Sequence, residues 1–503
     1  MLVKNHLPIL LKRYHRFVFG YAVIAIIFFA LLLILPNLIP QGLSSQEMQS
    51  VIASHQITLP SFKSPFELGF SVVDLPYHLL QKLSLQLFGF NTYAIKLPSA
   101  IIAVFTSLLI VVLLNRWFKS NVAIVGSAFT LLSSAFLFLA SSGTPAIMYV
   151  FYLTLLVWAG AKAFASPTPS LAVLSLLGAT LGLMLYTPQL SLLIVGLASA
   201  VFLRPDLLNI FKAWPTKLKC ALVFSFLFFA LPLLAAGFFR PTLFYDLVFP
   251  PKLNFHAFIT NIASAFAPFF SFSLAYDSIY LAPLFGLATV ALVFVGIIAS
   301  STLVFSTRNS VISLLVIFAI IASGFNPLVA ISIVLPIAIL TTTGFEYILN
   351  RWHSLFPTNV YAHFIGTVPV VILVSMISIS GFAHFLAGYN YTPRVVKNFN
   401  TDLSLINAHL NKGSLLFLSK TNPDYPFFAL LASYQNFHVI FTLRDLPQDA
   451  TELSVLTKTK ADLTAEPDFD RLQDFRLKKL LTSPKSQNSA RIFIYQKLEK
   501  QGD

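Results

Sequence analysis

Charged residues are scarce in this chain of 503 residues, of which they make up 10%. A typical soluble protein contains about 25% charged residues. Hydrophobic residues account for 57% of the chain, and its mean hydropathy is +0.79. Apolar stretches of roughly the 17–25 residues that cross a bilayer recur up to residue 387. This composition excludes a soluble enzyme and indicates a multi-pass protein whose surroundings are the lipid bilayer.

The sequence also lacks the common signatures of metal and cofactor chemistry. Cys220 is its single cysteine, so neither an internal disulfide nor a thiolate metal cluster can form. There is no P-loop, no G-x-G-x-x-G, no H-E-x-x-H, no G-x-S-x-G and no D-x-D. We therefore expect neither a bound metal ion nor a cofactor.

The charges that are present follow a topological pattern. Of eighteen lysines and arginines before residue 388, thirteen fall in alternate segments between the apolar runs and five in the intervening ones. This asymmetry follows the positive-inside rule, so the net charge of +14 orients the chain and does not indicate a nucleic-acid partner. We predict a cytoplasmic N-terminus and an extracytoplasmic C-terminal part in the plasma (inner) membrane.

Residues 1–387 are predicted to form a transmembrane domain with two large external loops, 37–98 and 240–279. The part 255–270 of the second loop is apolar and is expected to lie in the membrane interface. About eleven spans are expected, at 17–35, 99–118, 122–140, 145–163, 171–186, 190–203, 222–239, 280–301, 311–323, 328–347 and 364–387.

The composition changes after Gly388, because the last 116 residues hold twelve of the nineteen acids. Strands are predicted at 415–418, 438–442 and 491–497, and helices at 398–410 and around 427–434. The fold class is therefore a mainly α, polytopic helical membrane protein with a small extracytoplasmic α/β domain, residues 388–503.

Loop 37–98 is the part of the chain where we expect chemistry. Two short amphipathic helices are predicted in it, at 46–54 and 77–88, each too short to span the membrane. Glu47 begins the first helix among uncharged neighbours. A carboxylate in a poorly solvated cleft becomes a stronger base, so Glu47 is a candidate general base.

Short motifs of this loop resemble the GT-C class of membrane glycosyltransferases, which includes protein O-mannosyltransferases and lipid A aminoarabinose transferases. They read Gly42-Leu43-Ser44-Ser45-Gln46-Glu47, Leu87-Phe88-Gly89 and Ala94-Ile95-Lys96-Leu97-Pro98-Ser99. The class typically has Gly-x-x-x-Asp-Glu, Leu-Phe-Gly and Arg-Leu-Pro-Ser at these places. Two departures are evident: Gln46 stands where the class has its aspartate, and Asp74 lies where a Lys-Pro-Pro segment is expected.

The resemblance implies an inverting, metal-independent transfer of a sugar from a polyprenyl-phosphate donor to an acceptor glycan, lipid or protein on the outer face of the membrane. It implies Glu47 as the catalytic base and Asp74 as a second acid. The substrate-binding residues that we expect are Gln46, Lys63, His78, Lys82, Arg240 and Lys252, with the basic ones near the lipid phosphate, where they would stabilise the charge of the leaving group.

Two other functions are open at this stage. A catalytically inactive membrane scaffold is favoured by the missing aspartate and lysine. A transporter or flippase of lipid-linked sugars would need charged or polar groups inside its spans, and the sequence has few of them.

Overall fold

The computed structural model describes residues 25–39, 42–57, 72–239, 241–242, 247, 254–270, 286–301, 306–355, 360–391, 396, 398–409, 413–418, 424–435, 437–447, 450–456, 463, 469–482 and 491–498. Helices dominate this part of the chain, as the sequence predicts. Their bounds are α2 (Ser45–Gln56), α3 (Leu75–Phe88), α4 (Thr92–Trp117), α5 (Ser120–Leu131), α6 (Ser134–Ser141), α7 (Ile147–Ala163), α8 (Leu171–Met184), α9 (Ser191–Leu203), α10 (Pro205–Ala213), α11 (Thr216–Phe239), α13 (Phe255–Phe270), α14 (Leu287–Ser301), α15 (Thr307–Phe325), the 3-10 helix η1 (Pro327–Ile333), α16 (Val334–Leu355) and α17 (Val360–Tyr391).

Five helices in the described residues are long and apolar enough to cross a membrane. Two further pairs of helices are each bent at a short break, and the number of candidate spans rises to seven if each pair counts as one span. One bent pair is α5 with α6, which replaces the expected straight span 122–140 by a 62° break. The other is α9 with α10, at 93°. Apolar helices of 10–17 residues occupy five further places, including 25–38 and 147–163. The chain is a multi-pass membrane protein, although eleven separate full-length spans are not distinguished.

The helices of loop 37–98 form where the amphipathic pattern places them. Helix α2 buries Met48 and Val51. Helix α3 instead exposes four of its leucines, of which Leu83 is 50% and Leu87 68% exposed, and buries His78, Gln81 and Ser84 together with Tyr77 and Leu85. An apolar outer surface on a short helix suits the membrane interface.

The C-terminal part contains a five-stranded mixed sheet in the order β4-β3-β5-β7-β6. β3 (Leu415–Phe417) is parallel to β4 (His438–Ile440) and to β5 (Glu452–Leu456). β7 (Arg491–Lys497) runs antiparallel to β5 and to β6 (Phe475–Thr482). Helices α19 (Asp402–His409) and α20 (Tyr425–Gln435) accompany the sheet. Three strands lie where the sequence predicts them, whereas β5 and β6 were not predicted.

The first loop contacts the C-terminal part through a strand pair and a hydrophobic cluster. β1 (Leu43–Ser44) pairs antiparallel with β2 (Phe399–Asn400), although some 350 residues separate them in the chain. One hydrophobic cluster then joins loop residues such as Val51 and Phe90 to Ile406 and Phe427 of the C-terminal part. α17 continues to Tyr391, beyond the predicted boundary at 387/388, so we propose that the C-terminal domain begins after this helix and packs on α2 and α3.

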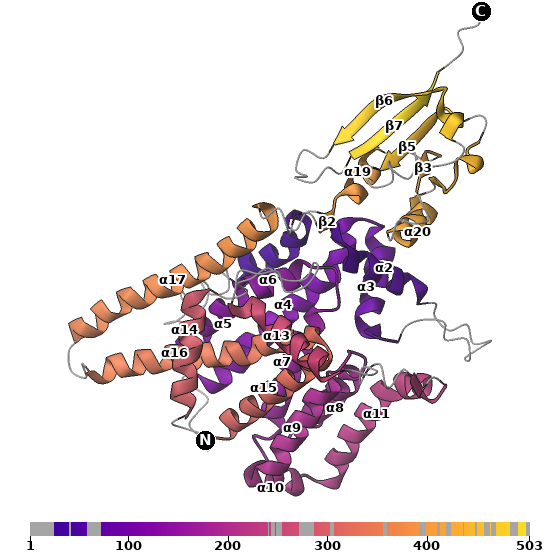
Figure 1. Cartoon of the computed structure of the whole chain (residues 1–503). Helices are drawn as coiled ribbons and strands as arrows, with labels where there is room; N and C mark the ends of the chain where they lie inside the picture. The colour runs from indigo at the N-terminus through magenta and orange to yellow at the C-terminus, as the bar shows by residue number, and fades with distance from the viewer. Residues whose placement is uncertain are drawn as a thin grey trace, which may run out of the picture.

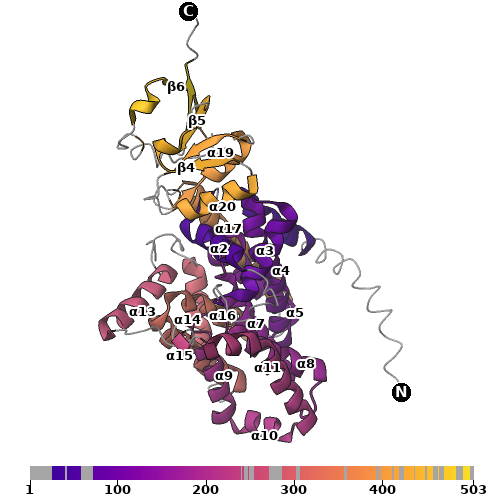
Figure 2. The ribbon, with the colours of Figure 1, turned by 90° about the vertical axis from the view of Figure 1, so that its right-hand side faces the viewer.

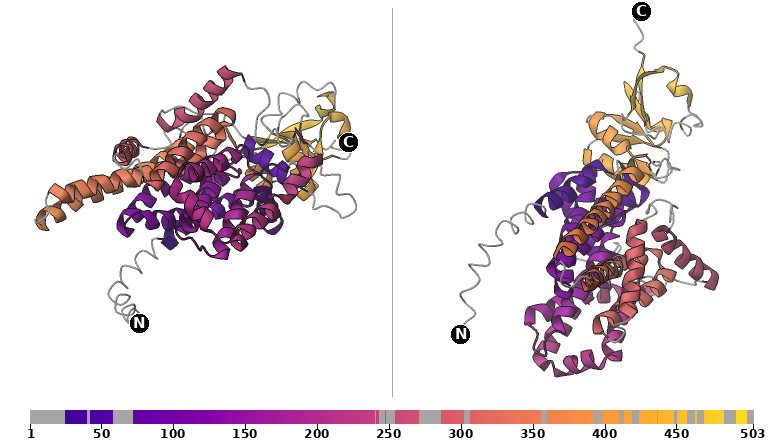
Figure 3. Two further views of the ribbon diagram at one scale, coloured as in Figure 1. Left: turned by 90° about the horizontal axis from the view of Figure 1, so that it is seen from below. Right: turned by 90° about the vertical axis from the view of Figure 1, so that its left-hand side faces the viewer.

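The sheet, with α2 and α3 directly beneath it, lies at one end of the molecule, and α10 lies at the other (Figure 1). The view turned by 90° shows the same order (Figure 2). Helix α17 packs against α5 and α6 and runs up to the sheet (Figure 3). The basic segment around α10 and the C-terminal sheet are therefore at opposite ends.

Candidate active site

A cavity of about 300 Å³ lies against α2, at the end of the molecule that carries the sheet. We call it the site cavity. Its walls come from α2, the start of α3, the turn between α6 and α7, and the first turn of η1. It is lined by Gln46, Gln49, Ser50, Ala53, Asp74, His78, Thr144, Pro145, Ala146, Tyr149 and Leu328.

Helix α2 contributes one of its faces to this cavity. Gln46, Gln49, Ser50 and Ala53 follow the i, i+3, i+4, i+7 spacing that aligns side chains along a helix. Glu47 is rotated by about 100° from Gln46 on the same helix, and it does not line the cavity. The helical geometry therefore brings the amide of Gln46, and not the carboxylate beside it, to the cavity.

Asp74 reaches the cavity through an unusual backbone conformation. It precedes α3 with φ 53° and ψ 27°, a left-handed conformation that is uncommon for residues other than glycine, asparagine and aspartate. Its backbone N–H donates to Tyr186 O at 2.8 Å, which holds it in place. Its side chain does not cap the helix, and within the described residues Oδ1 accepts no hydrogen bond. Asp74 Oδ1 is thus a buried acceptor without a hydrogen-bond partner in this part of the chain.

Burial raises the pKa of Asp74 from its ordinary value of 3.8 to about 7, and the nearby Thr187 side chain offsets part of the rise. The cause is the cost of moving a carboxylate charge out of water. Proton acceptors work best when their pKa lies near the operating pH. Asp74 therefore lines the cavity with a pKa near neutral pH.

His78 lies one helical turn after Asp74 on α3 and also lines the cavity. Its Nδ1 is 2.9 Å from the hydroxyl oxygen of Ser54. Burial lowers the pKa of His78 to about 4, against a smaller opposing effect of Gln81, so its imidazole is neutral at physiological pH.

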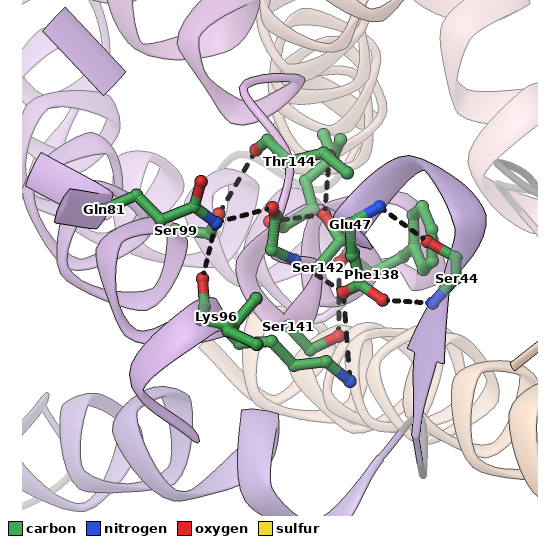
Figure 4. Close-up of polar contacts among 12 residues, drawn as sticks. Ser44, Glu47, Gln81, Lys96, Ser99, Phe138, Ser141, Ser142 and Thr144 are labelled. Carbon is green, nitrogen blue, oxygen red and sulfur yellow. Dashed lines mark hydrogen bonds and ion pairs between the residues drawn. The ribbon is translucent and has the colours of Figure 1, made fainter. Parts of the chain in front are cut away.

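Glu47 is fully buried in a hydrogen-bonded cluster beside the cavity (Figure 4). Its Oε2 accepts the backbone N–H of Ser44 at 2.7 Å, and the Ser44 hydroxyl accepts the N–H of Glu47, which together form a capping box. Its Oε1 accepts the N–H of Gly143 at 2.6 Å and lies 3.9 Å from Lys96 Nζ. We call this arrangement the Glu47 clamp, because it joins α2 to the turn that supplies Thr144 to the cavity.

The basic residues that were predicted to bind the lipid phosphate do not line the cavity in the described part of the chain. Lys82 donates to the carbonyl oxygen of Ile57 and does not line the cavity. Lys63, Arg240 and Lys252 lie outside the described residues. The described lining contains no lysine or arginine, so the basic group for a lipid phosphate remains a prediction.

Sequence reasoning missed two features that the sequence does contain. Ser44-x-x-Glu47 is a capping-box pattern, which predicts a structural role for Glu47. The helical spacing from Gln46 predicts that Gln49, Ser50 and Ala53 share its face. Tyr149 and Leu328 carry no comparable signal, because only the tertiary structure brings them to α2.

Comparisons with known proteins show which family model and which solved structures the chain is similar to. The family model of the dolichyl-phosphate-mannose-protein mannosyltransferases matches residues 76–234, from α3 to α11. This segment includes His78 and excludes α2, Asp74 and the C-terminal sheet. A comparison with curated protein sequences finds no match.

Solved structures match over nearly the whole chain. ArnT from Cupriavidus metallidurans is similar both bound to undecaprenyl phosphate (10% identity, TM-score 0.53) and in the apo state (11%, 0.55), and each match covers 95% of this chain and 98% of ArnT. The Archaeoglobus fulgidus oligosaccharyltransferase tethered to an acceptor peptide has 12% identity and a TM-score of 0.48, covering 97% of this chain and 74% of its own. The chain has the fold of the GT-C membrane glycosyltransferases, as the sequence predicts.

Proposed function

We propose that this protein transfers a sugar from a polyprenyl-phosphate donor to an acceptor hydroxyl on the outer face of the plasma membrane. The observation that carries the proposal is the site cavity, in which Gln46, Asp74 and His78 meet within a GT-C fold. The similarity to ArnT, whose structure was determined with undecaprenyl phosphate, supports the class of donor.

The geometry favours Asp74 as the catalytic base. In the reaction, the Asp74 carboxylate takes the proton of the acceptor hydroxyl, whose oxygen then attacks the anomeric carbon of the donor. The bond from this carbon to the phosphate oxygen breaks, and the lipid phosphate leaves with the electron pair. Glu47 is expected to act as a positioning residue, because both of its oxygens already accept backbone N–H groups.

Asp74→Asn tests this assignment. Removing a general base lowers the rate by roughly 100- to 10,000-fold, and we expect this loss in membranes that are supplied with a polyprenyl-phosphate sugar. Glu47→Gln keeps the shape but loses one of the two N–H acceptors, so we expect less folded protein and a smaller loss of rate per folded molecule. Glu452→Gln, an exposed acid paired with Lys478 in the C-terminal sheet, is the matched control and should change neither quantity.

Gln46→Asp separates the enzyme from an inactive scaffold. Gln46 already lines the cavity at the place where the class carries its aspartate. If the parent protein is inactive with every donor tried and Gln46→Asp is active, the native chain is a scaffold that retains the fold. If the parent is active and Asp74→Asn is as fast as the parent, Asp74 is not the base.

A further inference from the structure

A hydrogen-bonded chain under the site cavity determines where the protons of His78 lie. The chain begins at Gln81, whose side-chain nitrogen donates to two backbone carbonyl oxygens, Ile95 O at 3.0 Å and Gly143 O at 3.1 Å. Carbonyl oxygens only accept hydrogen bonds, so this end of the amide must be the NH₂ group. The other end, Oε1, is therefore an acceptor.

Two serine hydroxyls of α2 surround Gln81 Oε1. Ser50 Oγ lies 2.9 Å from it and Ser54 Oγ lies 2.6 Å from it. Ser54 Oγ is also 2.8 Å from the carbonyl oxygen of Ser50. Both neighbouring oxygens of Ser54 are acceptors, so only the Ser54 hydroxyl can supply a proton to these two contacts.

The third neighbour of Ser54 is Nδ1 of His78, at 2.9 Å. If the Ser54 proton pointed to this nitrogen, two acceptor oxygens would lie within 2.8 Å of Ser54 Oγ with no proton between them. Such contacts are repulsive in a buried site. The alternative leaves only one such contact, because the Ser54 proton then points to one of the two oxygens while His78 Nδ1 carries a proton and donates it to Ser54 Oγ.

In a neutral imidazole only one nitrogen carries a proton, so Nε2 of His78 is left with a free lone pair. Within the described residues Nε2 forms no hydrogen bond, and His78 lines the site cavity. We infer that His78 is a specificity-determining residue that presents an unprotonated Nε2 as hydrogen-bond acceptor for a hydroxyl group of the sugar donor or of its acceptor.

This role differs from that of Asp74. The low pKa of His78 makes its imidazole a poor proton acceptor at neutral pH, but a hydrogen-bond acceptor does not need to take the proton. A buried acceptor that binds a hydroxyl also rejects analogues without it, because the acceptor is then left unpaired. The inference rests on the proposed function for the identity of the ligand, whereas the proton positions rest on the hydrogen-bond chain alone.

The first test measures the proton positions. Nitrogen-15 NMR of histidine-labelled protein in proteoliposomes distinguishes the two neutral tautomers, and the His78 signals are those that disappear in His78→Gln. We expect protonated Nδ1 and bare Nε2. Ser54→Ala removes the Nδ1 partner and should shift these signals. A proton on Nε2, or a charged ring at pH 7, would overturn the inference whatever the activity.

The second test measures recognition of the hydroxyl. An asparagine amide reaches the Nδ1 position but leaves no acceptor at Nε2, whereas a glutamine amide reaches Nε2. We expect kcat/KM to fall about 10- to 100-fold in His78→Asn, the usual cost of one lost hydrogen bond, and to recover in part in His78→Gln. His55→Asn, an exposed histidine of α2 that contacts Tyr434, is the control.

The outcomes separate the two proposals. A change in KM for the donor or for the acceptor shows which substrate carries the hydroxyl. An unchanged kcat/KM in His78→Asn contradicts the recognition role even if the tautomer is as expected. A parent protein that transfers no sugar but shows the expected tautomer contradicts the proposed function and leaves the proton assignment intact.

Discussion

Asp74 combines three features that are unfavourable for stability. Its backbone is left-handed, its carboxyl group is buried, and one of its oxygens accepts no hydrogen bond within the described residues. Strained backbone conformations and unpaired buried groups are unfavourable by themselves, and they concentrate at sites that bind or react. The raised pKa of Asp74 predicts how the rate of transfer and the stability of the fold depend on pH.

The rate of transfer should fall as the pH falls below about 7, since only ionised Asp74 can accept a proton. In a pH profile of kcat/KM we expect a tenfold loss for each unit below this value. The Asp74→Asn variant should have a low rate without this acidic limb. A profile of the parent that stays flat down to pH 5 would contradict the role of Asp74.

Stability should show the opposite effect. The folded protein raises the pKa of Asp74 from 3.8 to about 7, so its ionisation disfavours the fold by on the order of 4 kcal/mol above pH 7. The cost develops between pH 3.8 and 7 and is absent at lower pH. Asp74→Asn should therefore melt at a higher temperature than the parent at pH 8, and the difference should vanish toward pH 4. Equal melting temperatures at pH 8 would show that the carboxylate is better solvated than its location indicates.

At the scale of elements, the pairing of β1 with β2 connects the first loop to the C-terminal sheet. Gly42 immediately precedes β1 with φ +86°, and a Cβ atom there would lie 2.4 Å from the backbone oxygen of Asn400. Only glycine avoids both the left-handed strain and this contact. β1 also contributes to the Glu47 clamp, because its residue Ser44 donates its backbone N–H to Glu47.

Gly42→Ala should weaken this pairing. The left-handed conformation alone costs about 1–2 kcal/mol for alanine, and the contact with Asn400 adds to it. We expect faster proteolysis between α17 and β2 and a lower melting temperature. Gly413→Ala is the matched control, because Gly413 has φ +85° but open space at its Cβ. Equal effects of both substitutions would assign the loss to strain alone and not to the contact between the two parts.

At the scale of the whole molecule, α10 and the C-terminal sheet lie at opposite ends of the helical bundle (Figure 1). The hydrophobic cluster that joins α2 and α3 to α19 and α20 places the sheet beside the site cavity. Truncation before β2 would expose this cluster, so we regard the C-terminal part as a structural component of the site region.

The orientation of the chain in the membrane can be tested directly. Reporter fusions at Arg204, just before α10, and at Gly413, just before β3, should report opposite sides of the membrane, with Arg204 cytoplasmic. The physical reason is the concentration of basic residues around α10. Two fusions on the same side would invalidate the proposed topology, and reversed sides would invalidate the assignment of the site to the outer face.

Several features were predictable from the sequence because they depend on local patterns. Apolar runs predict membrane helices, alternating basic segments predict the two ends, and the strands 415–417, 438–440 and 491–497 lie within the predicted ranges. β5 and β6 were missed because Glu452 opens the first, and the second, Phe475–Thr482, carries three basic residues in an exposed edge strand without alternation.

The sequence by itself determined the class of protein and the loop that holds the site. The tertiary structure decided which of the two described acids of that loop lines the cavity. Glu47 and Asp74 are both isolated carboxylates in the sequence, but capping-box geometry and the Gly143 N–H engage Glu47, whereas Asp74 has a left-handed backbone and lines the cavity. These differences depend on Gly143, 96 residues after Glu47, and on Tyr186, 112 residues after Asp74, and no local pattern of the sequence contains them.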